Sequence, residues 1–255
     1  MIRRWFAFAT VAAIVLAGCS RPSPSPESPA AEQLAVHTSP VVTDDRVEPP
    51  LGHGTFAAVS LDRLIDVYHR PDPTTEPRFR LDTINGVGEP LALLVSDQAV
   101  DASGDAWLKV LLPIRPNGAA GWVHMSDVRV EQMEERILVD LSSRTLRHFV
   151  DGELVDEFSV GIGRPETPTA TGTFYIWAHV PQASPYGPYG VYALGLSGFS
   201  EVLKDWPGGG RMGIHGTSHA SDEGQMVSHG CVRVYNDEMK LLKRAPLGTP
   251  VIIRQ

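Results

Sequence analysis

Short apolar runs separated by turn-forming residues extend from about residue 53 towards the end of the chain, and this pattern most constrains the fold. Between residues 53 and 130 the runs include LIDVYH, PLALLVSD, DAWLKVLLP and GWVHMSDVRV, and no helical period persists for ten residues. Runs of this length and composition are typical of strands. Asn85-Gly86 and Asn117-Gly118 are hairpin-type turn signals. The pattern therefore predicts a small β domain over residues 53–130.

The remainder of the chain, residues 134–255, is also predicted to be mainly β. Apolar and polar residues alternate in ILVDL (137–141), as expected for a half-buried strand. Asp151-Gly152 marks a hairpin turn between LRHFV and LVDEFSV, and PVIIRQ closes the chain as a strand. The segment 181–210 is rich in Gly and Pro, and we expect it to lie outside the core.

One helix is predicted near the end of this second part. Asn236 can serve as its N-cap, and Asp237 and Glu238 would then occupy the first turn. Lys243 and Arg244 would lie in the last turn, where positive charge suits the helix dipole. The expected fold is thus mainly β with a single late helix.

The first residues carry the signals of export. Two arginines precede the apolar run WFAFATVAAIVLAG, which is too short to span a bilayer comfortably. The sequence LAGC, which ends at Cys19, resembles a bacterial lipobox. This resemblance implies a signal peptide over residues 1–18 and a lipid on Cys19. An ordinary secretory signal that is cleaved nearby is the alternative.

A tether is predicted between the lipidated cysteine and the folded part. Residues 19–50 are rich in proline, serine and small polar residues and poor in aromatics, so they bury too little surface to fold. Proline favours extended conformations of about 3.1 Å per residue. We therefore expect an extracytoplasmic, membrane-anchored lipoprotein of the bacterial envelope whose folded part works at some distance from the membrane.

The predicted export of the protein raises the question of what Cys231 does, because Cys231 is the only cysteine besides Cys19. A disulfide would be allowed outside the cytoplasm, but lipidation of Cys19 leaves Cys231 without a partner. A nearby imidazole is the usual means of activating a thiol at neutral pH. His215 precedes Cys231 by sixteen residues, and His229 precedes it by two. A buried inert cysteine and a zinc site that includes His219 remain the alternatives.

The residues around Cys231 also fit acyl transfer. Gly230 lacks a Cβ, so its backbone can approach a ligand closely and adopt positive φ. The N–H groups of His229, Gly230 and Cys231 could meet a developing oxyanion. Arg233 could pair with a substrate carboxylate through two hydrogen bonds.

Charge argues against one class of partner. The formal net charge is −8, and the chain contains no run of lysines or arginines. A nucleic-acid-binding protein normally presents such a basic surface to the phosphate backbone. We therefore expect no nucleic-acid partner.

The motif around Cys231 resembles that of the L,D-transpeptidases of bacterial cell walls. In that family a His-Gly pair is followed, after a gap, by Ser/Thr-His-Gly-Cys and a hydrophobic residue, and this chain has His215-Gly216 and then SHGCV (228–232). The stretches VDLSSRTLRHFVDGELV and TPTATGTFYI are similar to the family's opening strands and to its turn before a strand. The resemblance covers residues 136–255 and implies the family's β-sandwich-like catalytic domain.

The resemblance also implies roles for individual residues. Cys231 would be the nucleophile and His215 its base and acid, while the carbonyl of Gly216 would orient the imidazole. The amides of His229, Gly230 and Cys231 would form the oxyanion hole. The substrate site would include Ser228, Arg233, Tyr192 and Trp206, with a lid drawn from residues 181–210; the role of Arg233 is open because some members have asparagine there.

The implied activity is cross-linking of peptidoglycan stem peptides without a metal or any other cofactor. Cys231 would attack the carbonyl of the third residue of a tetrapeptide stem, release D-alanine and pass the acyl group to an acceptor amine. An L,D-carboxypeptidase that uses water, or a non-catalytic wall-binding lipoprotein, is the alternative. A papain-like peptidase does not fit, because no histidine follows Cys231, and a sortase lacks the Ser-His-Gly-Cys run.

The predicted N-terminal β domain also resembles a known type of domain. Residues 53–130, with Gly-Trp-Val near their end, resemble a bacterial Src-homology-3-like barrel. Such a barrel would bind the cell wall or act as a spacer. Because every predicted catalytic residue lies after residue 210, we expect residues 134–255 to be acylated by a carbapenem without the barrel. A monomer is expected.

Overall fold

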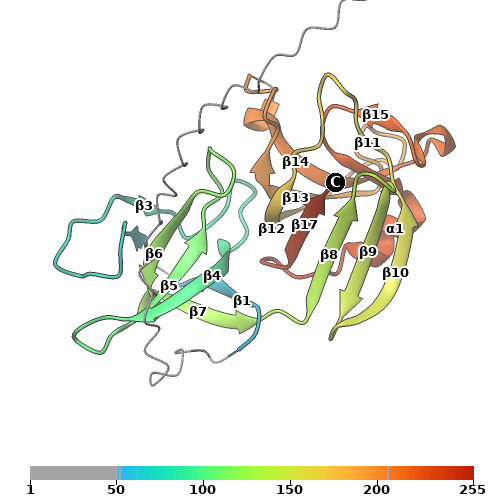
Figure 1. Cartoon of the computed structure of the whole chain (residues 1–255). Coiled ribbons are helices and arrows are strands. Elements are labelled where there is room, and N and C mark those ends of the chain that lie inside the picture. The colour runs from blue at the N-terminus through green and yellow to red at the C-terminus, as the bar shows by residue number, and fades with distance from the viewer. Residues whose placement is uncertain (1–50, 52, 62, 206) are drawn as a thin grey trace, which may run out of the picture. The chain divides into compact units, whose positions relative to one another are not determined.

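The N-terminal part of the folded chain is a five-stranded antiparallel sheet in the order β6-β5-β4-β1-β7 (Figure 1). Its strands are β1 (Phe56–Ser60), β4 (Ala92–Val100), β5 (Ala106–Leu111), β6 (Ala120–His124) and β7 (Val128–Gln132). A separate pair is formed by β2 (Ile65–Val67) and β3 (Phe79–Leu81), and the 3-10 turn η1 (Met125–Asp127) precedes β7. The predicted β structure is confirmed, whereas the assignment to the Src-homology-3-like class stays a prediction.

The computed structural model describes residues 51, 53–61, 63–205 and 207–255. The signal peptide, Cys19, the tether and Trp206 therefore lie outside the described residues. The described residues belong to a unit that spans Asp45–Gln255. No helix within these described ranges has the length and apolar character needed to cross a membrane.

The C-terminal part is an eight-stranded sheet in the order β10-β9-β8-β17-β12-β13-β14-β16. Its strands are β8 (Glu135–Asp140), β9 (Thr145–Val150), β10 (Glu153–Ser159), β12 (Gly172–Pro181), β13 (Tyr192–Phe199), β14 (Arg211–Thr217), β16 (Val232–Tyr235) and β17 (Pro250–Arg254). The pairs β8–β17 and β14–β16 are parallel, and the other pairs are antiparallel. A short parallel pair, β11 (Ile162–Gly163) and β15 (Met226–Ser228), lies beside β16.

The two halves of this sheet pack face to face around one core, which confirms the predicted sandwich-like fold. Ile137 and Val139 of β8 share a buried cluster with Leu194 of β13 and Ile214 of β14. The helix α1 (Asn236–Leu242) adds Met239 and Leu242 to the same cluster. Burial alternates along β8, as its period-two sequence pattern requires. The late helix is thus confirmed as part of a mainly β protein.

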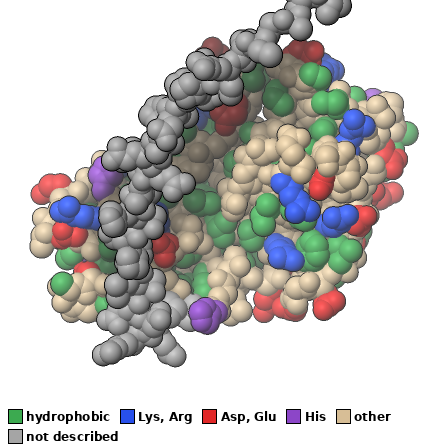
Figure 2. Space-filling view, viewed as in Figure 1, with side chains coloured by type: hydrophobic (Ala, Val, Ile, Leu, Met, Phe, Trp, Pro, Cys, Tyr) green, Lys and Arg blue, Asp and Glu red, His purple; other side chains and the backbone are tan. Residues whose placement is uncertain are grey.

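The hairpin between β9 and β10 follows the local sequence signal. Asp151 and Gly152 have φ of 51° and 84°, the two positive values that a tight twisted hairpin turn requires. On the outer surface the pair Arg147–Glu157 joins the two strands at 2.6 Å. Figure 2 shows Lys and Arg side chains interspersed with Asp and Glu on this side of the molecule.

Three local expectations are wrong. Segment 181–210 contains the core strand β13, because Leu194 and Leu196 alternate with small residues and are fully buried. Tyr235, not Asn236, occupies the N-cap of α1, since β16 runs directly into the helix. The backbone N–H of Tyr235 donates to Glu238 Oε2 at 2.9 Å. The helix ends at Leu242, so Arg244 lies beyond it.

Strand β12 forms a wall shared by the two parts of the fold. Phe174 and Ile176 face the C-terminal core, while Tyr175 is fully buried in the N-terminal core and Trp177 packs against that core. Successive side chains of a strand point to opposite faces. The unbroken apolar run FYIW is therefore explained by burial on both faces.

Candidate active site

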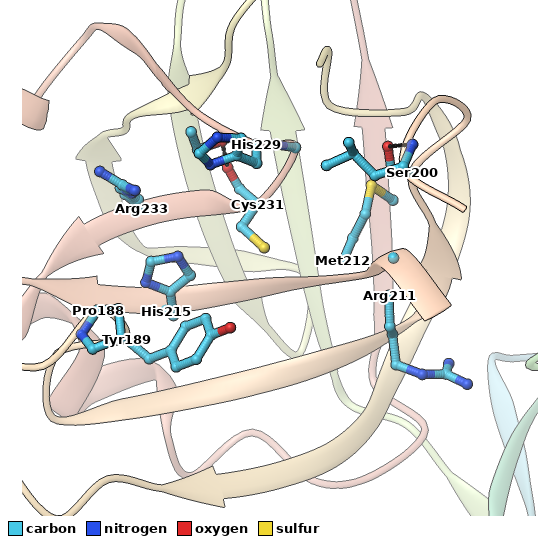
Figure 3. Close-up of a pocket in the computed structure, with 13 residues that line it drawn as sticks. Pro188, Tyr189, Ser200, Arg211, Met212, His215, His229, Cys231 and Arg233 are labelled. Carbon is cyan, nitrogen blue, oxygen red and sulfur yellow. Dashed lines mark hydrogen bonds between the residues drawn. The ribbon is translucent and has the colours of Figure 1, made fainter. Parts of the chain in front are cut away.

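Parallel pairing of β14 and β16 brings the predicted nucleophile and base together. His215 lies on β14 opposite Arg233, and Cys231 immediately precedes β16. In Figure 3 the thiol of Cys231 points into a space that the imidazole of His215 borders. Both residues line a cavity of about 120 Å³. Two residues that are sixteen positions apart in sequence thus meet at one sheet edge.

A second cavity adjoins the same pair of side chains. It has a volume of about 280 Å³ and is lined by apolar residues that include Trp177, Val180 and Leu194. His215 and Cys231 line both cavities. The imidazole and the thiol therefore lie where the two cavities adjoin.

His215 is held as a neutral base. Its side chain is buried, and Nδ1 lies 3.0 Å from the carbonyl oxygen of Gly216. A carbonyl only accepts, so Nδ1 carries the proton and Nε2 keeps its lone pair. Burial lowers the pKa of His215 from 6.5 to about 4, although the bond to Gly216 opposes this shift. The predicted role of the Gly216 carbonyl as orienter has this contact as its geometric basis.

Cys231 is also favoured in its neutral form. Burial raises the pKa of the thiol, while a hydrogen bond from the backbone of Gly213 and the charge of Arg233 act in the opposite direction. Desolvation penalises whichever form of a group is charged. Both shifts favour a neutral thiol beside a neutral imidazole as the resting pair.

The turn before Cys231 is held by Ser228. Its Oγ accepts the N–H of Gly230 at 3.0 Å and donates to the carbonyl of Cys231 at 2.6 Å. Ser228 is buried, and Gly230 has φ of 118°, a value that favours glycine. One of the three predicted oxyanion donors, the amide of Gly230, is thus bonded within the turn. His229, Gly230 and Ser228 all line the smaller cavity.

Arg233 lies at this cavity but is paired with a residue that sequence reasoning missed. Its Nη1 donates to Asp222 Oδ2 at 3.2 Å, and the hydroxyl of Thr217 donates to the same oxygen at 2.6 Å. Asp222 is buried, and Arg233 Nε is buried without a hydrogen-bond partner. The guanidinium is therefore only partly compensated and can still attract an anionic group. No spacing in the sequence distinguishes Asp222 from its neighbours.

Tyr189 is the tyrosine that borders the site. Its ring meets that of His215 edge to face, with centroids 5.1 Å apart and planes at 88°, and it lines both cavities. The predicted Tyr192 instead packs on the core, with its ring 6.2 Å from that of His179. The sequence PYGPYGVY offers no period that separates Tyr189 from its neighbours. The predicted Trp206 lies outside the described residues.

The histidines and cysteine of this region do not assemble as metal ligands. Within the part of the chain that the structure describes, no group of three His, Cys, Asp or Glu side chains is placed to hold a metal ion. His219 is exposed on the turn before η3 (Ala220–Asp222). The zinc alternative therefore has no supporting geometry among these residues.

Comparison with known proteins identifies the family. The model of the L,D-transpeptidase catalytic domain, YkuD, matches residues 134–253. A Bacillus licheniformis protein provisionally named L,D-transpeptidase YkuD is 39% identical over 119 residues, 46% of this chain and 64% of that protein. This chain thus spans slightly less than two thirds of that relative's length.

Two further similarities concern a second relative and a solved structure. A Bacillus subtilis protein provisionally named L,D-transpeptidase YqjB is 30% identical over 129 residues, 46% of this chain and 69% of that protein. The NMR structure of the catalytic domain of an E. faecium L,D-transpeptidase is 26% identical, covers 49% of this chain and 100% of that domain, and gives a TM-score of 0.36. On the sequence matches, the chain belongs to the YkuD family of L,D-transpeptidase catalytic domains.

Proposed function

We propose that this protein is a cysteine-dependent L,D-transpeptidase that acts on peptidoglycan stem peptides. The observation that carries the proposal is the pairing of Cys231 with a buried His215 whose Nδ1 is bound to the Gly216 carbonyl at 3.0 Å. This contact leaves Nε2 able to accept a proton in the cavity that holds the thiol. Membership of the family supports the reaction type.

The first half-reaction forms a thioester. Cys231 Sγ attacks the carbonyl carbon of the third stem residue as His215 Nε2 takes the thiol proton. The tetrahedral intermediate collapses, the bond to the terminal D-alanine breaks, and His215 returns the proton to the leaving amine. Backbone amides of the 229–231 turn would stabilise the oxyanion, and Gly230 would exchange its bond to Ser228 for one to the substrate.

The second half-reaction transfers the acyl group. The amine of a neighbouring stem attacks the thioester, His215 accepts its proton, and Cys231 leaves with that proton restored. Arg233 would attract a carboxylate of one of the two stems, since Asp222 compensates its charge only in part. Two adjoining cavities at Cys231 suit a reaction that needs a donor and an acceptor.

The test is a reaction with a tetrapeptide donor and an amine acceptor, followed by mass spectrometry. We expect release of D-alanine and formation of a cross-linked product, with a covalent carbapenem adduct on Cys231 as a second readout. Cys231→Ser should lose nearly all turnover, because a hydroxyl is a much poorer nucleophile. His215→Gln should lose about 10²- to 10⁴-fold, the usual contribution of general acid–base transfer.

His219→Gln is the matched control, since His219 belongs to the same stretch but is exposed. It should leave turnover unchanged. Near-normal turnover of Cys231→Ser would remove the thiol from the mechanism. Release of D-alanine without a cross-linked product would instead assign the site to an L,D-carboxypeptidase, and an inert wild-type protein that binds stem peptides would support the wall-binding alternative.

We further propose that Cys19 anchors the enzyme to the membrane as a lipoprotein, with residues 19–50 as the tether. The lipobox-like LAGC and the proline-rich composition support this. Cys19→Ala should move the protein from the membrane fraction to soluble material and leave activity on detached substrate intact. Cys19→Ala protein that stays on the membrane after a salt wash would contradict the anchor.

A further inference from the structure

One wall of the Cys231 cavity is formed by a segment with little regular structure. Segment 199–211 runs from the end of β13 to the start of β14, and its described residues (199–205 and 207–211) contribute Ser200, Leu203, Gly210 and Arg211 to the cavity lining. Gly208, Gly209 and Gly210 follow one another with φ of 75°, 68° and 73°. Glycine loses more backbone freedom on ordering than any other residue. Holding this wall in one conformation therefore requires strong contacts.

Some of these contacts come from the wall itself. The N–H of Ser200 donates to the Gly210 carbonyl at 2.8 Å, and Ser200 Oγ accepts the N–H groups of Val202 and Leu203 at 3.3 and 3.1 Å. The carbonyls of Ser200, Leu203 and Gly209 are satisfied from outside. Ser200 is a buried residue, so its carbonyl needs such a donor, and the source of the donors decides how the wall is shaped.

The donors come from the N-terminal sheet. Arg115, in the loop 112–119 between β5 and β6, donates from Nη1 to Ser200 O at 2.8 Å and from Nη2 to Gly209 O at 2.9 Å. A longer contact of 3.4 Å joins Nη2 to Leu203 O. The guanidinium also lies 4.8 Å from the ring centre of Phe199. The planar guanidinium of Arg115 thus hydrogen-bonds both ends of the wall, at Ser200 and at Gly209.

Asn117 of the same loop fixes the point where β13 ends and the wall begins. Its Oδ1 accepts the N–H of Phe199 at 2.9 Å, and its Nδ2 donates to the Phe199 carbonyl at 2.8 Å. The side-chain amide therefore pairs with one residue as a neighbouring strand would. Nδ2 also contacts Glu201 Oε1 at 2.6 Å.

Arg211, the last residue of the wall, is hydrogen-bonded to the same loop. Its Nη2 donates to the Pro113 carbonyl at 3.3 Å, and its guanidinium lies 3.9 Å from the ring centre of Trp177. Arg211 lines both cavities beside Cys231. The wall is thus attached to loop 112–119 at its start, in its middle and at its end.

We propose that loop 112–119 of the N-terminal sheet shapes the substrate cavity of the enzyme, with Arg115 and Asn117 as positioning residues. The N-terminal part is then a component of the substrate site as well as a spacer or a wall-binding domain. The proposal rests on the proposed function, because the cavity is taken as the stem-peptide site. Arg115 donates hydrogen bonds to Ser200, Leu203 and Gly209 and to neither His215 nor Cys231, so the loop should affect binding more than chemistry.

The test compares Arg115→Ala, Arg115→Lys and Asn117→Ala in the full chain. For carbapenem acylation of Cys231 we expect Arg115→Ala to reduce the second-order rate constant by on the order of 10- to 100-fold. The loss should come mainly from weaker binding, with the maximal acylation rate and its pH profile nearly unchanged. A lysine ammonium cannot reproduce the two parallel N–H donors of the planar guanidinium. Arg115→Lys should therefore restore only part of the acylation rate that Arg115→Ala loses.

Hydrogen exchange gives a readout that does not depend on activity. Amides of segment 199–211 should exchange faster in Arg115→Ala and Asn117→Ala, while those of the β8–β9 hairpin, which report on global folding, should not change. Arg129→Ala is the matched control, because Arg129 forms an exposed ion pair with Glu131 on the same sheet. It should leave both readouts at wild-type values.

The outcomes separate this proposal from the proposed function. A wild-type protein that is never acylated contradicts the function, while exchange still reports whether the loop orders the wall. Wild-type acylation kinetics in both Arg115→Ala and Asn117→Ala would overturn the proposal, as would wild-type exchange in segment 199–211. A loss confined to the maximal acylation rate would also count against it, because that result would place Arg115 in the chemical step.

Discussion

At the level of single residues, the site is organised around a buried imidazole and a partly buried thiol, both of which favour their neutral forms. The pKa of His215 is lowered to about 4 and that of the Cys231 thiol is raised, in both cases chiefly by burial. A stable thiolate–imidazolium pair would require the opposite shifts. Proton transfer to His215 is therefore expected to accompany the attack of sulfur on the carbonyl.

The neutral resting forms of His215 and Cys231 predict how acylation depends on pH. The reactive form has neutral His215, which is present above pH 4 and lost as the pH falls through about 4. The rate constant for carbapenem acylation should therefore stay level from neutral pH down to about 5 and fall below it. The measurement is that rate constant between pH 3.5 and 8, with circular dichroism at each pH to confirm that the protein stays folded.

Alkylation by iodoacetamide supplies the complementary check. A thiol with a raised pKa should react slowly at pH 7 and faster only at alkaline pH. An acid limb of acylation near pH 6.5, or rapid alkylation at pH 6, would show that the resting pair is ionic.

At the scale of elements, the helix α1 controls a loop that borders the site. Asn236, in its first turn, accepts the N–H of Val191 at 2.9 Å and donates to the carbonyl of Pro185 at 3.0 Å. The loop between these residues carries Tyr189 against the imidazole of His215. Its Gly190 packs so closely on Gly216 and Asn236 that a Cβ would collide with both. The helix thus positions the ring that covers the base.

Replacement of Asn236 tests this arrangement. Asn236→Ala removes both hydrogen bonds to the loop, so Tyr189 should lose its fixed position over His215. We expect faster hydrogen exchange in residues 185–191 and an acylation rate lowered by on the order of tenfold, with the free energy of unfolding reduced by about 1–3 kcal/mol.

Asp237→Ala is the control on the same helix turn, since the Asp237 side chain is exposed and pairs only with Lys240 at the surface. Its effect on stability should stay below about 1 kcal/mol, and acylation should be unchanged. Equal exchange of residues 185–191 in Asn236→Ala and wild type would show that other contacts hold the loop.

At the scale of the whole folded unit, strand β12 lies between two cores. Tyr175 is fully buried among N-terminal residues, and its hydroxyl donates to the carbonyl of Leu111 at 3.2 Å. Asn85 Nδ2 donates to the Trp177 carbonyl at 2.8 Å. The N-terminal sheet therefore covers apolar surface of the C-terminal part, in addition to holding the wall of the cavity.

This interface changes the expectation for the separated C-terminal part. From the positions of the catalytic residues alone, residues 134–255 should be acylated like the full chain. Because this fragment would expose Tyr175 and lose the donors of Arg115, we now expect it to aggregate more readily and to be acylated at least tenfold more slowly. Light scattering and the acylation rate of the monomeric fraction are the measurements. Acylation of the fragment at the full-chain rate would show that the interface is dispensable.

Features that depend on local pattern could be predicted from the sequence alone. Alternation in ILVDL predicted a strand, and Asp151-Gly152 predicted the turn of a β hairpin, because side-chain period and turn geometry are local properties. The run SHGCV and the earlier His-Gly pair pointed to the family, and the match to residues 134–253 confirms it. The same local reasoning was wrong for segment 181–210, where a core strand of small and apolar residues was obscured by glycines and prolines.

Contacts between residues that are distant in the sequence depend on how the chain packs. Asp222 became the partner of Arg233 through the packing of the turn before β15, and Tyr189 rather than Tyr192 reached His215 because Asn236 holds its loop. The neutrality of His215 and Cys231 follows from burial, which no motif records. The link from Arg115 to the cavity wall spans 85 residues of sequence. Such contacts depend on which surfaces meet when the sheets pack, and the spacing of residues along the chain carries no information about that.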